Sequence, residues 1–274
     1  MIRLIALDLD DTTLRSDSTL DPVTADALRD AAAAGAEIVI ASGRAFASLP
    51  KDVLSLNVVR YAVTSNGAAV VDAVSGERII SFCLSKTAVD GILSRFSGEL
   101  LECCIAGRAY TDRRYVLDPV AYGCSPEYIE YVKTTRTPVD DMPRFIRKNE
   151  KRLDSVDVVC RTPERRARLF DLAETIDDVY VTSSSPRLVE ISAAESGKGA
   201  SLRKLCAELD VPAECVAAFG NGDNDADMLR FAHLGVAVEN ATDKCKAAAD
   251  HICPANDENG VAQTLRKIIG GELC

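Results

Sequence analysis

Tryptophan is absent from this chain of 274 residues, and aromatic residues make up only 5% of it. Because proteins that bind single-stranded nucleic acid stack its bases on aromatic side chains, no such platform is expected here. Basic residues are also outnumbered: 42 acids against 32 bases leave a net charge of −10. A nucleic acid or an anionic membrane surface needs cationic side chains to bind it. These shortages favour a small molecule as the partner.

Long apolar runs and C-x-x-C cysteine motifs are missing as well. No eighteen consecutive apolar residues occur, which excludes an ordinary membrane-spanning helix. The apolar opening Leu4 to Leu7 is followed at once by Asp8, so we expect no signal peptide. The ten cysteines include no C-x-x-C pair, and Cys245, His251 and Cys253 lack a familiar zinc spacing. We therefore expect reduced thiols and a cytoplasmic protein.

The start of the chain alternates between strand and helix patterns. Residues 2–7 form a nearly continuous apolar run that ends in acids, which is typical of a strand buried on both faces. Asp21 as N-cap and Pro22 after it predict a helix that ends at Gly35, and residues 38–41 predict a second strand. This strand–helix–strand order indicates a parallel sheet with right-handed crossovers.

The same alternation returns late in the chain, after an irregular middle. We expect strands at 188–191, 216–219 and 234–238, and helices at 199–209, through Met228 and Leu229, and at 261–269. The middle is interrupted by Pro119, Pro126, Pro138, Pro143, Pro163 and Pro186. The sequence therefore predicts an α/β fold with a Rossmann-like, doubly wound parallel sheet in residues 1–82 and 188–274. A second domain is inserted at 83–187.

Polar clusters follow the ends of three predicted strands. Asp8, Asp10 and Thr12 follow the first, Ser42-Gly43-Arg44 the second, and residues 220–225 a late one. A lone D-x-D pattern is weak evidence, because acids commonly end strands and cap helices. Ligands of open α/β sheets bind at the carboxyl ends of the strands, so the coincidence of three clusters there indicates a functional site.

Asp8 and Asp10 point the same way from an extended chain, and they repel unless a cation or a shared proton lies between them. Hard oxygen ligands with no nearby histidine or thiol favour Mg²⁺. One carboxylate can then attack a phosphate ester as a nucleophile while the other transfers protons. These residues predict phosphoryl transfer through an aspartyl phosphate.

Lys198 is the candidate cation that offsets repulsion between the attacking carboxylate and the phosphate. Gly197 and Gly199 flank it at a predicted helix start, where backbone amides can approach an anion. The alternative is a solvated lysine in a loop. Ser42-Gly43 offers a hydroxyl and free amides at another such start.

The loop at 220–225 packs four carboxylate or carboxamide side chains between glycines. An Asx-rich turn that caps the next helix would use the same residues. Because the predicted metal needs a third oxygen ligand, Asn221 and Asp225 are the candidates, with Asn224 available to the phosphate.

Four motifs, in this order and spacing, resemble those of the haloacid dehalogenase superfamily. They are Asp8-Leu9-Asp10-Asp11-Thr12, Ile40-Ala41-Ser42-Gly43-Arg44, Gly197-Lys198-Gly199, and Gly220-Asn221-x-x-Asn224-Asp225 with Met228-Leu229. The chain most resembles the Cof-type (subfamily IIB) phosphatases. The resemblance implies Mg²⁺ as cofactor, a C2B-type α/β cap as the inserted domain, and hydrolysis of small phosphorylated metabolites such as sugar phosphates or phosphorylated cofactors.

The resemblance also implies roles for individual residues. Asp8 is the nucleophile, Asp10 the general acid and base, and Lys198 holds both the phosphate and Asp8. The implied substrate-binding residues are Leu9, Thr12, Ser42, Gly43, Arg44, Lys198 and Asn224, and the implied metal ligands are Asp8, Asp10, Asn221 and Asp225.

Two positions depart from the family pattern. The family often has aspartate where this chain has Asn221, so we expect weaker metal binding or heavier reliance on Asp225. Asp11 replaces a common glycine, and aspartate tolerates the left-handed conformation that such a turn requires.

Thr64-Ser65-Asn66-Gly67 also resembles a family segment beside the active site. From the residues alone, Asn66-Gly67 between the apolar runs 61–63 and 68–71 predicts a tight hairpin turn. A substrate contact from this turn is the further possibility.

Three other functions use similar residues. A phosphomutase has the same nucleophile but shields the aspartyl phosphate from water, and an inactive phosphate- or metabolite-binding protein is suggested by Asn221 alone. A signalling receiver also takes phosphate on an aspartate at a sheet edge, but the insertion and the late Asn-Asp motif argue against it. The missing G-x-G-x-x-G after the first strand disfavours a dinucleotide-dependent dehydrogenase.

Overall fold

The computed structural model describes residues 1–185 and 187–273; Pro186 and Cys274 lie outside the described residues. The chain forms two compact units. The first comprises Met1–Gly43, Leu49–Ile80 and Gly197–Cys274, and the second comprises Arg44–Ser48 and Ser81–Ser196. The chain therefore passes out of the first unit after Gly43 and after Ile80, and it returns for the last time at Gly197.

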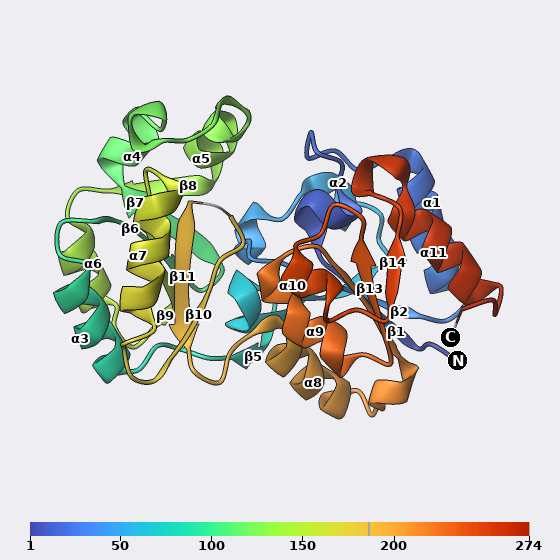
Figure 1. Cartoon of the computed structure of the whole chain (residues 1–274). Helices are drawn as coiled ribbons and strands as arrows, with labels where there is room; N and C mark the ends of the chain where they lie inside the picture. The colour runs from blue at the N-terminus through green and yellow to red at the C-terminus, as the bar shows by residue number, and fades with distance from the viewer. Residues whose placement is uncertain (186, 274) are drawn as a thin grey trace. The chain divides into compact units, whose positions relative to one another are not determined.

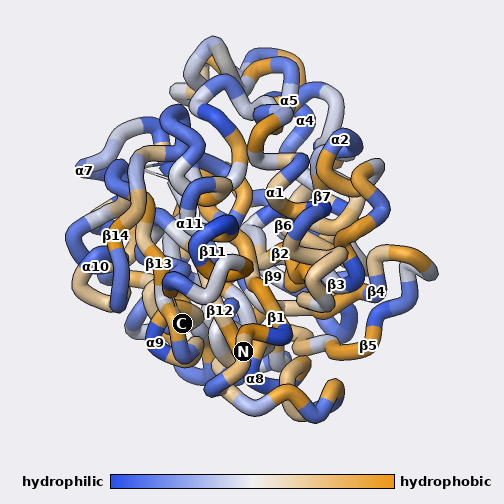
Figure 2. The backbone as a smooth tube through the Cα atoms, turned by 90° about the vertical axis from the view of Figure 1, so that its right-hand side faces the viewer, coloured by the Kyte–Doolittle hydropathy of each residue, from blue (hydrophilic) through white to orange (hydrophobic). Residues whose placement is uncertain are grey.

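The first unit is built on an eight-stranded sheet with the strand order β14-β13-β12-β1-β2-β3-β4-β5. The strands are β1 (Leu4–Leu7), β2 (Glu37–Ala41), β3 (Val59–Thr64), β4 (Ala69–Asp72), β5 (Arg78–Ser81), β12 (Val216–Gly220), β13 (Leu234–Val238) and β14 (His251–Cys253). From β14 through β3, neighbouring strands pair in parallel. All residues of β1 are buried, and its backbone is coloured as hydrophobic in Figure 2. The predicted parallel sheet is confirmed.

Helices cover both faces of this sheet. They are α1 (Pro22–Ala33), α2 (Lys51–Leu54), α8 (Lys198–Glu208), α9 (Ala226–Phe231), α10 (Asp243–Lys246) and α11 (Gly260–Ile269). The Asp21 side chain caps α1 by accepting a hydrogen bond from the Val23 amide. The helices α1 and α11 pack side by side, and so do α8 and α9 on the other side of the sheet (Figure 1). This is the doubly wound arrangement that the sequence predicts.

The second unit has a six-stranded sheet of its own, in the order β10-β11-β9-β6-β7-β8. Its strands are β6 (Leu100–Ile105), β7 (Arg108–Asp112), β8 (Arg136–Val139), β9 (Leu153–Val159), β10 (Val179–Thr182) and β11 (Leu188–Ala193). Its helices are α3 (Lys86–Arg95), α4 (Arg113–Leu117), α5 (Ile129–Thr135), α6 (Met142–Lys148) and α7 (Pro163–Ala173). Apolar side chains of α3, α6 and α7 pack with one face of the sheet in a separate core. No helix in the described part of the chain is long and apolar enough to cross a membrane.

The strand expected at 188–191 belongs to the second sheet, which corrects its predicted place in the first. It forms β11 and pairs antiparallel with both β9 and β10. A short apolar run predicts a strand, but it does not say which sheet supplies the partners, because pairing is decided by segments far along the chain. The first unit accordingly resumes at Gly197, not at Leu188.

The hairpin between β3 and β4 is confirmed, with a longer loop than the Asn-Gly turn implied. Thr64 pairs with Ala69, so four residues connect the strands. Gly67 in this loop has φ +90°, and a Cβ added to it would lie 2.2 Å from the Gly197 carbonyl oxygen. The loop therefore packs backbone to backbone against the segment that precedes α8.

Gly67→Ala should lower the free energy of unfolding by about 3 kcal/mol, because the new methyl group meets Gly197 and the left-handed conformation also becomes costly. Gly35→Ala is the matched control, since Gly35 has φ +96° with no atom within 4 Å of an added Cβ. The control should lose only about 1 kcal/mol. Urea unfolding measures both values, and equal losses would contradict the close packing at Gly67.

Candidate active site

Four segments that carry predicted site residues meet at one edge of the first sheet. Asp8 follows β1, Ser42 follows β2, the loop Ser65–Gly67 follows β3, and Asn221 follows β12. These strands are neighbours and run parallel. Their carboxyl ends therefore share the edge at which ligands bind in open α/β sheets.

Lys198 is the first residue of α8, and 0% of it is exposed to solvent. Its Nζ atom lies 2.7 Å from Asp8 Oδ1 and 2.6 Å from Asp225 Oδ1. Burial acts to lower the pKa of Lys198, but the charges of Asp225 and Asp8 outweigh burial and raise it. The lysine therefore stays charged, and it is paired on two sides as a buried charge requires.

Asp8 is held by several side chains. Thr12 Oγ1 donates a hydrogen bond to Asp8 Oδ2 over 2.8 Å, and Thr13 Oγ1 donates to the Asp8 backbone carbonyl over 2.5 Å. Burial and the charge of Asp225 raise the pKa of Asp8 to about 7, while Lys198 opposes this shift. Hydrogen bonds to both oxygens thus orient the Asp8 carboxylate, and Lys198 stabilises its charged form.

The turn after β1 presents Asp10 beside this pair. The charge of Asp10 contributes to the raised pKa of Asp8, so the two carboxylates lie within electrostatic range. Asp11 has φ 56°, which confirms the left-handed conformation expected at that position. Leu9 is buried with 0% exposure, so only its backbone could face a ligand.

Asp225 closes the loop after β12. Its Oδ2 atom accepts hydrogen bonds from the amides of Asn221 over 3.0 Å and Gly222 over 2.8 Å, and its Oδ1 atom accepts from Lys198. A Cβ on Gly220 would lie 2.4 Å from Asp225 Cβ, which explains the glycine there. Protein donors thus engage both oxygens of Asp225.

The side-chain oxygens near Asp8 suit a hard cation. Thr12 Oγ1 lies 3.1 Å from Asn221 Oδ1 as well as 2.8 Å from Asp8 Oδ2, and a hydroxyl has one proton for the two acceptors. Among residues 1–185 and 187–273, no three His, Cys, Asp or Glu side chains form a metal-holding group. Oxygen ligands of this kind are those that Mg²⁺ prefers, and a metal site formed by Asp8, Asp10 and the Asn221 carboxamide stays a prediction.

Asn66 is a site residue whose role the sequence did not specify. Asn224 Nδ2 donates a hydrogen bond to Asn66 Oδ1 over 2.9 Å, and the Asn66 amide donates to the Ser42 carbonyl over 3.2 Å. Asn66 therefore links two predicted phosphate-binding segments. The Asn-Gly pair marked the turn, but the pattern could not show what the carboxamide would bind.

Asp227 is the second residue that sequence reasoning missed. Its carboxylate accepts hydrogen bonds from the Gly199 amide over 3.0 Å and from the Met228 amide over 2.9 Å. Burial raises the pKa of Asp227, and these two amides oppose that shift. The bond to Gly199 fixes the first turn of α8 and with it the backbone of Lys198.

Arg44 lies in the second unit, whereas Ser42 and Gly43 end the opening segment of the first. The Arg44 guanidinium lies 4.7 Å from the centre of the Tyr131 ring, and Arg136 lies 4.5 Å from the same ring. These are cation–π distances. A phosphate contact by Arg44 stays a prediction.

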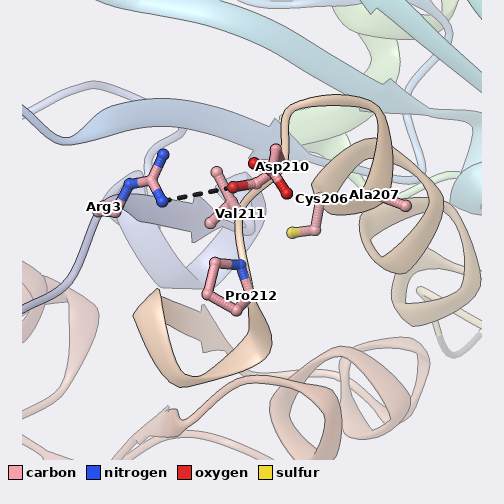
Figure 3. Close-up of a pocket in the computed structure, with 6 residues that line it drawn as sticks. All are labelled: Arg3, Cys206, Ala207, Asp210, Val211 and Pro212. Carbon is pink, nitrogen blue, oxygen red and sulfur yellow. Dashed lines mark hydrogen bonds between the residues drawn. The ribbon is translucent and has the colours of Figure 1, made fainter.

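A pocket of about 500 Å³ lies at the opposite edge of the first sheet (Figure 3). It is lined by Arg3, Cys206, Ala207, Asp210, Val211 and Pro212. Arg3 precedes β1 and donates a hydrogen bond to the Asp210 carbonyl over 3.3 Å. None of these six residues is a predicted site residue, so the pocket is separate from the acid–lysine cluster.

The chain is similar to known proteins along nearly its whole length. A family model described as haloacid dehalogenase-like hydrolase matches residues 5–265. Phosphatase YwpJ of Bacillus subtilis is 27% identical over 98% of this chain and 100% of its own. The 5-amino-6-(5-phospho-D-ribitylamino)uracil phosphatase YwtE of the same organism is 26% identical, over 100% of both chains. A solved haloacid dehalogenase-like hydrolase from B. subtilis has a TM-score of 0.84 at 26% identity, covering 97% of this chain and 99% of that one.

Asp225→Asn should destabilise the protein by about 3 kcal/mol, because it removes one of two carboxylates from a buried ammonium. Chemical denaturation measures the change. Asp26→Asn is the control, since the Arg29–Asp26 pair is exposed and its loss should leave stability unchanged within error. An Asp225→Asn protein as stable as the control would show that Lys198 needs only Asp8.

Proposed function

The chain belongs to the haloacid dehalogenase-like hydrolases, and on that basis we propose that it is a Mg²⁺-dependent phosphatase acting through an aspartyl phosphate. Its substrates are small phosphorylated metabolites, either sugar phosphates or phosphorylated cofactors and their precursors. The observation that carries the proposal is the contact of 2.7 Å between Lys198 Nζ and Asp8 Oδ1. It pairs a nucleophile with the cation that its attack on a phosphate dianion requires.

Asp8, Asp10 and Asn221 are the residues that would hold Mg²⁺. When bound, the ion supplies positive charge that offsets the phosphate oxygens. Asn221 is preferred to Asp225 as the third ligand, because Asp225 already accepts from Lys198 and from the Asn221 and Gly222 amides. Asp225 thereby serves to position Lys198.

The reaction proceeds in two displacements. An Asp8 oxygen forms a bond to phosphorus while the ester bond breaks, and Asp10 gives its proton to the departing alkoxide. Water then attacks the phosphorus, Asp10 takes its proton, and inorganic phosphate leaves as Asp8 is regenerated. Thr12 keeps the Asp8 carboxylate oriented throughout through its bond of 2.8 Å.

Lys198, Ser42 and Asn224 bind the phosphoryl oxygens in this proposal. Lys198 contributes a fixed charge, and Asn66 holds Asn224 in place over 2.9 Å. Groups arranged in advance stabilise developing charge without the cost of reorganising during the reaction. Leu9 and Gly43 contribute through their backbones, and Arg44 remains a proposed phosphate contact.

The relatives support the substrate class. Both curated relatives above are named phosphatases, and one name specifies a phosphorylated ribitylamino uracil. The net charge of −10 disfavours nucleic acid and anionic membrane as partners and favours a small metabolite. The cytoplasm remains the proposed location.

Asp8→Asn should reduce phosphate release from 4-nitrophenyl phosphate by at least roughly 10³-fold, because a carboxamide cannot form the acyl phosphate. Asp26→Asn on the surface serves as control and should keep full turnover. Free phosphate as the product separates a phosphatase from a phosphomutase. Turnover by Asp8→Asn at the rate of the control would refute the nucleophile.

Removal of Mg²⁺ with EDTA should abolish turnover, and added Mg²⁺ should restore it. Asn221→Asp should lower the Mg²⁺ concentration for half-maximal activity, since a carboxylate attracts the ion more strongly than a carboxamide. A Mg²⁺ titration of both proteins measures this shift. Unchanged titrations would remove Asn221 from the metal site, and activity in EDTA would remove the metal from the mechanism.

A further inference from the structure

Three consecutive residues in the loop after β3 adopt the left-handed conformation. Ser65 has φ 49°, Asn66 φ 52° and Gly67 φ 90°. Glycine takes this conformation without cost and asparagine tolerates it, but serine is strained in it. Ser65 must therefore be held in place by the rest of the structure, and such strain concentrates at functional sites.

The Ser65 hydroxyl is buried without a partner. Only 3% of Ser65 is exposed, and its Oγ atom has no hydrogen-bond partner within the described residues. A buried hydroxyl that makes no hydrogen bond loses the bond it had with water and gains none in return. A serine is therefore a poor choice at this position unless a bound molecule completes the bond.

The residues next to Ser65 are fixed to the proposed phosphate-binding groups. Asn66 accepts from Asn224 over 2.9 Å, and Gly67 accepts through its carbonyl from Ser201 Oγ of α8 over 2.6 Å. The close approach of Gly67 to Gly197 further ties the loop to the segment that carries Lys198. These contacts hold the backbone on the C-terminal side of Ser65 against the proposed phosphate-binding groups.

We propose that Ser65 is a substrate-contacting residue whose hydroxyl donates a hydrogen bond to a phosphoryl oxygen of the substrate. The inference rests on the proposed function, which places a phosphate group among Ser42, Lys198 and Asn224. A phosphoryl oxygen is the acceptor expected there, and hydrogen bonds to charged oxygens are stronger than those between neutral groups. The loop Ser65–Gly67 thereby acts as a phosphate-binding segment in addition to the four motifs.

Ser65→Ala tests this role, because it removes the hydroxyl and keeps the rest of the loop. Titration calorimetry with inorganic phosphate, at saturating Mg²⁺, should show about tenfold weaker binding than wild type, which corresponds to ~1.4 kcal/mol. The melting temperature should stay the same or rise, since an unpaired buried hydroxyl is lost. A purely structural serine would not combine weaker phosphate binding with undiminished stability.

Ser18→Ala is the matched control, because Ser18 is an exposed serine with φ 63° that lies outside the site. It should bind phosphate like wild type. If Ser65→Ala melts at a lower temperature than wild type, phosphate binding is measured on Ser65→Gly instead. Glycine adopts this conformation freely and also lacks the hydroxyl. Phosphate affinity within twofold of wild type in the stable variant would overturn the proposal.

This measurement is independent of turnover. A wild-type protein that binds phosphate but releases none from 4-nitrophenyl phosphate would refute the phosphatase proposal and still report on Ser65. A wild-type protein that turns over normally, with Ser65→Ala binding phosphate equally well, would refute only the role of Ser65.

Discussion

The buried ammonium of Lys198 is the constraint on which the site depends. A charge with no access to water must be neutralised inside the protein, and Asp8 and Asp225 do this from the ends of β1 and of the loop after β12. Each partner is held in turn, Asp8 by Thr12 and Asp225 by backbone amides. The requirement to satisfy one cation thus fixes the relative positions of three segments that are far apart in the sequence.

Much of the first unit could be predicted from sequence because its central strands are buried on both faces. Such strands appear as apolar runs, and helix caps such as Asp21-Pro22 mark the elements between them. The place of β11 could not be predicted, since its apolar run fits either sheet and its partners β9 and β10 are chosen by tertiary pairing. The local sequence pattern indicates whether a segment forms a helix or a strand, but it indicates much less about which elements lie beside that segment.

The same distinction applies to the site. The residue types and the sheet edge indicated that Asp8, Asp10 and Lys198 act together, because chemistry demands acids and a cation at one place. The sequence left Asn221 and Asp225 as equal candidates for the metal. Our proposal of Asn221 rests on the hydrogen bonds of Asp225, which depend on how a loop folds back on itself. Asn66 was missed as a bridge for the same reason: a carboxamide's partner is a property of the folded chain.

Two of the four points at which the chain crosses between the units lie next to predicted site residues in the sequence. The first crossing follows Gly43, the residue after Ser42. The last crossing precedes Gly197, which has φ 124° and is followed by Lys198. Backbone that connects the two units therefore also carries two predicted site side chains. A substitution that alters the backbone at either crossing would thus displace a predicted site residue as well as the connection itself.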